Sequence, residues 1–379
     1  MALVLNQELT MLRDSVSGYL SDFAPVGQLR RLRDENSKLR YDLKTWDKMS
    51  QMGWLGVIVP EKYGGVDMGL QAAGVISEEM GKHLTASPYI STSVMGVTGL
   101  VKFGSERQKN TWLPTLVKGE TIIAVAVDEG RTHQPDYCDV RAERSGNGFK
   151  LTGNKKFVAD GTNADLFLIS ARTSGGVKEK DGITVFLIEK GVLGLALKGQ
   201  AMVDSRDTVS LNLNNIEVSS DYVLGEIDGG RNHLEPILDA GRVCLAAELL
   251  GSSQECLQRT LIYIKNRSQF GKAIGSFQGI QHRVAHLYSE VELSKSIVIA
   301  ALQSSDKDQD DVPMMVSAAK SKLGSVAQLA AQEAIQMHGG IGMTDEYDIG
   351  FFIKRIRVAD AMLGGSSFHA DRFASLRGY

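Results

Sequence analysis

The sequence predicts an α+β protein whose secondary structure comes in three successive blocks: helical, then β-rich, then helical again. Through the first block, apolar residues recur at the three- and four-residue spacing of amphipathic helices. In the second block the segments are short, β-rich and bounded by Gly, Asn and Asp. From Arg231 the helical period returns and continues to the end. Because helices and strands do not alternate, this order argues against a doubly wound parallel sheet.

The first block, residues 1–120, is expected to form an all-helical domain. Its expected helices cover residues 5–23, 42–52, 70–81, 87–103 and 105–116. The stretch PEKYGGVDMG (60–69) and Gly104 mark loops between them.

The middle block, residues 121–228, is expected to form a separate β domain. Its expected strands cover residues 121–127, 149–158, 164–172, 182–190, 195–202 and 208–218. The even spacing of these segments is close to the rhythm of an antiparallel barrel or sandwich.

The last block, residues 229–379, is expected to form a helical bundle. Its expected helices cover residues 233–266, 276–304, 311–338 and 345–363. The short breaks between them favour antiparallel neighbours. The polar stretch QSSDKDQDDVP (303–313) is expected to be a solvated turn, with Pro313 at the start of the next helix.

Composition excludes several classes of function. The chain has 379 residues, 43% hydrophobic and 23% charged, with a formal net charge of -3, so it lacks the basic footprint of a nucleic-acid-binding protein. No apolar run is long enough to span a membrane, and the N-terminus does not resemble a secretory signal. The three scattered cysteines fit a reducing compartment rather than disulfides or a metal site. We therefore expect a cytoplasmic protein.

Two glycine- or arginine-containing stretches are candidates for binding an anionic ligand. In QMHGGIGMTDEYDIG (336–350), glycines after a helix can bring backbone N–H groups close to an anion, although a plain helix–helix turn has the same pattern. In NRSQFGKAIGSFQGIQ (266–281), Arg267 suits a pyrophosphate and Phe270 can flank an aromatic ring. The alternative for this second stretch is a solvated loop with buried aromatics.

The segment LDAGR places Asp239 and Arg242 three residues apart, hence on one face of a helix. A local ion pair and a site for a nucleotide-bearing substrate both fit this spacing.

Five segments, taken together and in order, resemble the acyl-CoA dehydrogenase superfamily over almost the whole chain. They are MGWLGVIVPEKYGG (52–65), FGSERQKNTWLPTLVKGE (103–120), LTGNKKFVADGTNADLFLISAR (151–172), RSQFGKAIGSFQ (267–278) and QMHGGIGMTDEY (336–347). The resemblance implies an N-terminal helical domain, a middle antiparallel β-barrel and a C-terminal four-helix bundle.

The resemblance also implies a chemistry. Members of the superfamily bind FAD and a CoA thioester, remove the α-proton with a carboxylate, and pass a hydride to flavin N5. An electron-transfer flavoprotein is the implied electron acceptor, and the implied assembly is an oligomer. The residues that match cofactor-binding positions are Val127, Asp128, Phe157, Ala159, Arg267, Phe270, Gln278, Gln336, His338, Gly339, Gly340 and Ser366. Asp239 and Arg242 match the substrate-binding pair.

The chain departs from the family pattern beside the flavin ring. A Thr-Glu-Pro-Gly-x-Gly-Ser-Asp-like turn is replaced by DEGRTHQPD (128–136), and a Trp-x-Thr segment by Phe157-Val158-Ala159. Phe157 can still cover an aromatic face, but Ala159 has no hydroxyl to offer flavin N5.

The catalytic base is also missing. The two family positions for the catalytic Glu are Gly364, in GGSS, and Gly241, directly before Arg242. Glu248 and Glu129 are the alternative carboxylates, although each also fits a structural role.

Within the superfamily, the phrases HGGIGMTDE, FFIKRI and SFHADRF resemble small subunits of pimeloyl-CoA-type and steroid-side-chain dehydrogenases, which pair with a Glu-bearing chain. The resemblance thus implies fatty acid or steroid catabolism and either a homo-oligomer or a hetero-oligomer. Two alternatives remain: a base-free elimination enzyme acting on a CoA thioester, and a non-catalytic subunit that completes a partner's FAD site.

Overall fold

The computed structural model describes residues 5–379, and the chain divides into two compact units. The first unit contains residues up to Arg31, Leu70–Thr85 and Arg242–Tyr379, and the second contains Leu32–Gly69 and Ala86–Gly241. The long helix α7 (Gly230–Asn266) contributes residues to both units.

The first unit is helical apart from one small hairpin. Its elements are α1 (Gln7–Phe23), α2 (Val26–Asp34, in part), α4 (Gly69–His83), α7 from Arg242 on, β9 (Ser268–Gln269), β10 (Lys272–Ala273), α8 (Gln278–Asp306), α9 (Val312–His338), α10 (Ile349–Ala361) and α11 (Ser366–Leu376). Local signals start several of them. The Asn6 side chain accepts a hydrogen bond from Leu9 N at the start of α1, and Pro313 lies in the first turn of α9 as expected.

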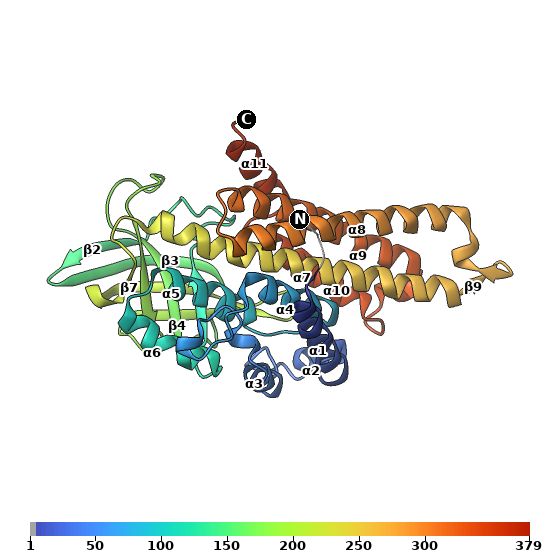
Figure 1. The fold of residues 1–379 in the computed structure, drawn as a ribbon, viewed down its shortest axis with the longest axis horizontal. Helices are drawn as coiled ribbons and strands as arrows, with labels where there is room; N and C mark the ends of the chain where they lie inside the picture. Colours follow the sequence, from blue (N-terminus) through green and yellow to red (C-terminus); the bar gives the residue numbers. More distant parts are fainter. Residues whose placement is uncertain (1–4) are drawn as a thin grey trace. The chain divides into compact units, whose positions relative to one another are not determined.

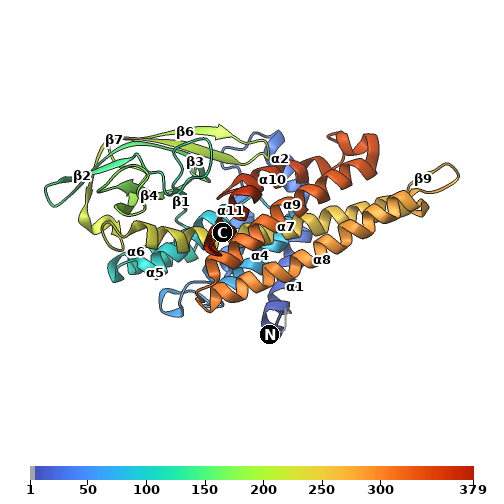
Figure 2. The ribbon, with the colours of Figure 1, turned by 90° about the horizontal axis from the view of Figure 1, so that it is seen from above.

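Helix α9 is the centre of this unit. It packs against α8, α10 and α11, and α8 and α9 run side by side in both views (Figures 1 and 2). The face of α9 that is buried contains many alanines, which allow close helix packing. In α8, by contrast, only seven of 29 residues are buried, and Tyr288 and Leu293 are more than half exposed. Much of α8 is therefore available to a partner surface.

The second unit combines short helices with one sheet. Its helices are α3 (Leu43–Gln51), a π-helix (Ile90–Gly96), α5 (Val97–Phe103), α6 (Glu106–Val117) and the start of α7. Its strands are β1 (Ile123–Ala126), β2 (Arg141–Ser145), β3 (Gly148–Ala159), β4 (Leu166–Arg172), β5 (Ile183–Glu189), β6 (Leu195–Ala201), β7 (Asp207–Ser219) and β8 (Val223–Leu224).

The central sheet is present, but it is open and mixed and does not close into the expected antiparallel barrel. The strand order is β6-β7-β3-β2-β4-β5-β8, with β1 paired to β4. A barrel requires its two end strands to pair, but among the described residues β6 pairs only with β7 and β8 only with β5. The pairs β1/β4 and β2/β4 are parallel.

The order helices, strands, helices is confirmed, but several elements were not expected. Strand β2 is mostly exposed and polar, so it lacks the apolar alternation that predicts a strand. Strand β8 is too short to have a pattern. Helices α2 and α11 were also missed. The division of the chain into domains 1–120, 121–228 and 229–379 stays a prediction.

Among residues 5–379, no helix combines the length and apolar character needed to cross a bilayer.

Candidate functional site

The turn between α10 and α11 has a backbone that requires glycine at position 364. Leu363 has φ +56 and Gly364 has φ +99, so the chain passes through the left-handed region for two residues. A Cβ placed on Gly364 would lie 2.3 Å from Cδ1 and 2.9 Å from Cε1 of Phe368, and 3.0 Å from His369 Nε2. The Phe368 ring thus occupies the space that any side chain at position 364 would need.

Buried basic groups hold this turn in place. The Lys320 ammonium has no exposed surface and donates to the carbonyls of Ala359, Asp360 and Gly364 at 3.1, 2.7 and 3.0 Å. Burial lowers the pKa of Lys320 to about 7, and the Asp360 carboxylate opposes that shift. No feature of the sequence indicated that this lysine is buried.

The carbonyl of Leu363 is the second anchor of the turn. It accepts a hydrogen bond from Arg242 Nε at 3.2 Å and one from His369 Nε2 at 3.0 Å. The His369 side chain is fully buried, and burial followed by the charges of Arg242 and Lys320 lowers its pKa to about 2. His369 is therefore a neutral hydrogen-bond donor within the fold.

Ser366 begins α11 and is tied to the preceding helix. Its N and Oγ both donate to Asp360 Oδ1, at 3.1 and 3.0 Å, while Gln328 Nε2 donates to Asp360 Oδ2 at 2.9 Å. The Ser366 hydroxyl keeps an acceptor lone pair, and its role toward the cofactor stays a prediction.

The expected substrate pair, Asp239 and Arg242, is buried. The exposed fractions are 3% for Asp239 and 0% for Arg242. The Arg242 guanidinium carbon lies 5.8 Å from the centre of the Phe368 ring. The substrate-binding role of this pair stays a prediction, and it requires the side chains that cover the guanidinium to move.

Neither alternative carboxylate is free to act as a base. Glu248 is 3% exposed, and its two oxygens accept from Arg355 Nε at 2.7 Å and from a terminal nitrogen of Arg355 at 2.8 Å. Glu129 forms an ion pair with the fully buried Lys155 at 2.7 Å. Both acids therefore have structural partners, and the other family position for a base, Gly241, lies buried inside α7.

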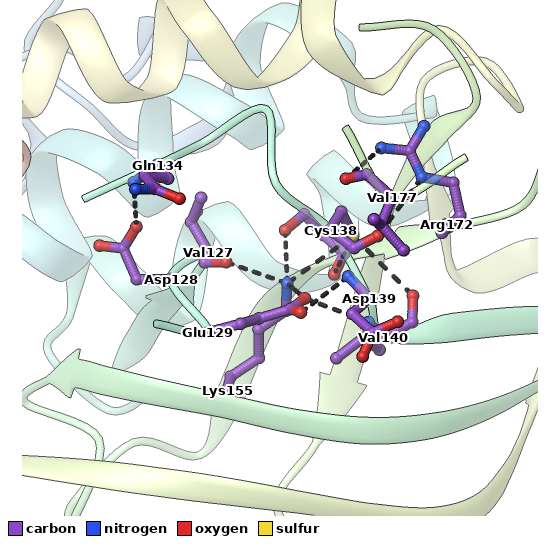
Figure 3. Close-up of polar contacts among 11 residues, drawn as sticks. Val127, Asp128, Glu129, Gln134, Cys138, Asp139, Val140, Lys155, Arg172 and Val177 are labelled. Carbon is purple, nitrogen blue, oxygen red and sulfur yellow. Dashed lines mark hydrogen bonds and ion pairs between the residues drawn. The ribbon is translucent and has the colours of Figure 1, made fainter. Parts of the chain in front are cut away.

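Lys155 organises the start of the turn at residues 128–136, which the sequence predicts to lie at the flavin (Figure 3). Its ammonium donates to the Val127 carbonyl at 3.0 Å and to Ser170 Oγ at 2.9 Å. The Glu129 carboxylate in turn accepts from the backbone N–H groups of Asp139 and Val140 at 2.7 and 3.2 Å (Figure 3). This network closes the two ends of the turn onto each other.

Inside that turn, the Asp128 side chain is paired locally. Its carboxylate accepts from Gln134 N at 3.1 Å and contacts His133 Nδ1 at 2.9 and 3.0 Å. The Asp128 carbonyl accepts from Lys156 N at 2.7 Å. His133 was not predicted, because nothing in the sequence shows that the turn folds back on Asp128.

Phe157 lies inside a β-bulge of β3, between Lys155 and Val158, and Ala159 is the last residue of that strand. Phe157 has φ +53 and is 50% exposed, Val158 between them is 1% exposed, and Ala159 is half-buried. Beyond the bulge, alternation places Ala159 on the face opposite to Val158, away from the core, and Phe157 is exposed within the bulge itself. An aromatic face that is half exposed suits a planar ring system.

In the first unit, the β9–β10 hairpin presents the expected pyrophosphate-binding loop. Arg267 and Gln278 are exposed, and within residues 5–379 the Arg267 guanidinium has no hydrogen-bond partner. Phe270, at the tip, is 92% exposed and has its ring centre 6.3 Å from that of Phe277. An unpaired guanidinium beside an exposed aromatic ring fits the diphosphate and ring of a nucleotide cofactor.

The segment after α9 presents backbone rather than side chains. Gly339 and Gly340 are exposed, and a Cβ on either would meet no atom within 4 Å; Gln336 is exposed too. The His338 side chain is 3% exposed, lies 2.7 Å from the Ala334 carbonyl and 3.2 Å from the Tyr347 hydroxyl, and its pKa is lowered by burial. His338 therefore positions the segment, while the glycines leave its backbone accessible.

Comparison with known proteins places the chain in a family. The family model of the acyl-CoA dehydrogenase N-terminal domain matches residues 6–120, and that of the acyl-CoA dehydrogenase C-terminal domain matches residues 228–375. The short/branched chain specific acyl-CoA dehydrogenase of Rattus norvegicus is 30% identical over 356 residues, covering 92% of this chain and 81% of the relative.

Solved structures of the family have the same fold. An acyl-CoA dehydrogenase from Geobacillus kaustophilus superposes with a TM-score of 0.91 at 26% identity, covering all of both chains. A chain of the ChsE4-ChsE5 complex from Mycobacterium tuberculosis superposes with a TM-score of 0.90 at 25% identity, covering 100% of this chain and 99% of that one.

The protein belongs to the acyl-CoA dehydrogenase family, whose members are flavoenzymes. The family's reaction is the FAD-dependent dehydrogenation of an acyl-CoA, and FAD is the cofactor of this chain's family. The rat relative is mitochondrial by name, so a cytoplasmic location stays a prediction.

Proposed function

We propose that this chain is an FAD-binding subunit of an acyl-CoA dehydrogenase and that a partner subunit supplies the catalytic carboxylate. The observation that supports this most is the turn at Gly364. Its backbone has φ +99, and the Phe368 ring lies 2.3 Å from the position of a Cβ. Both the backbone and the packing disfavour a glutamate at this position.

The state of the other acids supports the same conclusion. Glu248 and Glu129 are each held by a buried cation at 2.7 Å, so neither has a free, mobile carboxylate. A general base must be free to reach the proton that it removes. A carboxylate fixed by a buried cation is not free to move in this way.

The chain's own residues would bind and orient the cofactor. Arg267 and Gln278 would hold the diphosphate part, the backbone of 338–340 would offer N–H groups to an anion, and Phe157 would cover one face of the ring system. The network of Lys155 and Glu129 fixes the turn next to Asp128. When bound, FAD accepts the hydride that leaves the acyl chain, and an electron-transfer flavoprotein is the proposed electron acceptor.

The proposed partner is a related chain with a glutamate at the position of Gly364 or Gly241. The structural neighbour from Mycobacterium tuberculosis is described as a complex of two chains, which supports a hetero-oligomer. Helix α8 has only seven buried residues of 29 and therefore offers surface for such contact. Fatty acids and steroids are the proposed source of the acyl group.

Purification of the tagged chain from its native source tests this proposal. We expect a second acyl-CoA dehydrogenase chain to co-purify, the complex to be yellow, and acyl-CoAs to bleach the flavin anaerobically. The chain expressed alone is expected to leave the flavin oxidised under the same conditions, since general-base catalysis contributes about 10²–10⁴-fold. Rapid bleaching by the chain alone would show that it has its own base and would overturn the proposal.

A further inference from the structure

Thr208, at the start of β7, has a buried hydroxyl that lacks a partner. The residue is 4% exposed, and its Oγ1 has no hydrogen-bond partner among residues 5–379. Buried hydroxyl groups in folded proteins nearly always have a partner, so an exception calls for an explanation such as a ligand.

The register of the sheet places this hydroxyl next to Ala159. Thr208 pairs directly with Ala159 of β3, and Val209 pairs with Val158. Directly paired residues of antiparallel strands have their side chains on the same face. Val158 and Val209 are each 1% exposed and face the core, so Thr208 and Ala159 lie together on the opposite face.

We propose that the Thr208 hydroxyl forms the hydrogen bond to the flavin ring system that a hydroxyl at position 159 would otherwise provide. This inference rests on the proposed function, because it takes Phe157 and Ala159 as the flavin-facing residues. In this proposal the hydroxyl comes from β7, the strand that pairs with β3, instead of from position 159 on β3.

The chemistry of a hydroxyl suits this role in both redox states. A threonine hydroxyl has one donor and two acceptor sites. It donates to an unprotonated ring nitrogen of the oxidised flavin, and it accepts from the same nitrogen once that nitrogen carries a hydrogen. The neighbouring Ala159 has neither function. Because Thr208 is 4% exposed, the contact requires the side chains that cover its hydroxyl to move.

Replacing Thr208 by valine tests the proposal, since valine keeps the β-branched shape and loses the hydroxyl. The complex purified from the native source is stripped of flavin and titrated with FAD. We expect Thr208→Val to weaken FAD binding about tenfold and to shift the visible flavin spectrum. Thr208→Ser should bind FAD like the parent, and Ser210→Ala, the next residue on that face of β7, is the matched control.

Two further measurements separate a cofactor contact from a merely structural role. In the flavin-free protein, Thr208→Val should raise the thermal midpoint, because it removes an unpartnered buried hydroxyl. Adding Ala159→Thr to Thr208→Val should restore FAD affinity by returning a hydroxyl to the adjacent strand.

The outcomes also distinguish this inference from the proposed function. Equal FAD affinity and identical spectra for the parent and Thr208→Val would overturn the role of Thr208 and leave the proposed function intact. A parent complex that binds no FAD would overturn both.

Discussion

Substituting Gly364 by alanine is the sharpest test of the turn that excludes a catalytic acid. Carbon atoms in contact normally lie ~3.5–4.0 Å apart, whereas a Cβ at position 364 would be 2.3 Å from Phe368 Cδ1. The ring must therefore move by more than about 1 Å. Overpacking of this kind costs ~1–3 kcal/mol, and the left-handed backbone at φ +99 costs ~1–3 kcal/mol more for a residue with a side chain. We expect Gly364→Ala to lower the free energy of unfolding by about 2–6 kcal/mol.

A double-mutant cycle separates the two contributions. Phe368→Ala removes the ring that a new Cβ would strike, so the two substitutions should couple favourably by ~1–3 kcal/mol, while the backbone strain remains. Urea unfolding of the parent, both single variants and the double variant measures this coupling. At Gly365, the next residue of the turn, a Cβ would have no neighbouring atom closer than 3.8 Å, so Gly365→Ala is the matched control.

The same cycle has a functional readout. Gly364→Glu alone should not reduce flavin with acyl-CoA, because its carboxylate cannot enter the space of the Phe368 ring; Gly364→Glu with Phe368→Ala provides that space. If Gly364→Ala unfolds with the same free energy as the parent, to within about 0.5 kcal/mol, then sterics do not exclude a side chain at this position and the reasoning is wrong.

The remaining predictions concern cofactor binding, a buried ion pair and stability in acid. Arg267→Ala should weaken FAD binding about tenfold or more, because it removes charge-assisted bonds of ~1.5–3 kcal/mol. Lys265→Ala, a nearby exposed control, should leave FAD binding unchanged. Equal losses of affinity in the two variants would contradict the role of this loop in binding the pyrophosphate. Glu248→Gln or Arg355→Met alone should lower the free energy of unfolding by ~3–5 kcal/mol in urea titrations, whereas the double variant should recover most of it; additive losses would argue against a buried ion pair. His369 has a pKa of about 2 in the fold and about 6.5 when unfolded, so the unfolded state binds more protons between these values. Stability should thus fall as the pH drops below 6.5, by up to ~1.4 kcal/mol per pH unit, and His369→Gln should remove this part of the acid sensitivity.

The sequence by itself determined the block order and the family, and it predicted that the two usual positions of the catalytic glutamate hold glycine. The spacing of apolar residues in a helix or strand depends only on residues close together in the sequence. The six expected strands and most helices could therefore be predicted from the sequence. The five segments that resemble the family are likewise local stretches, so they and their order can be recognised without any knowledge of the fold.

Tertiary structure alone decided what the sequence left open. The sheet is mixed because β1 and β2 pair in parallel with β4, and among the described residues it is open because β6 and β8 do not pair with each other. Pairing between distant strands is not encoded in any local period. Glu248 and Glu129 are held by Arg355 and Lys155, and the Glu248–Arg355 partners are 107 residues apart in sequence. The reason for glycine at position 364 likewise depends on the Phe368 ring and on φ, which are properties of the folded turn. These features depend on contacts between residues that are distant in the sequence. A sequence pattern shows which residues are present, but it does not show which of them are in contact.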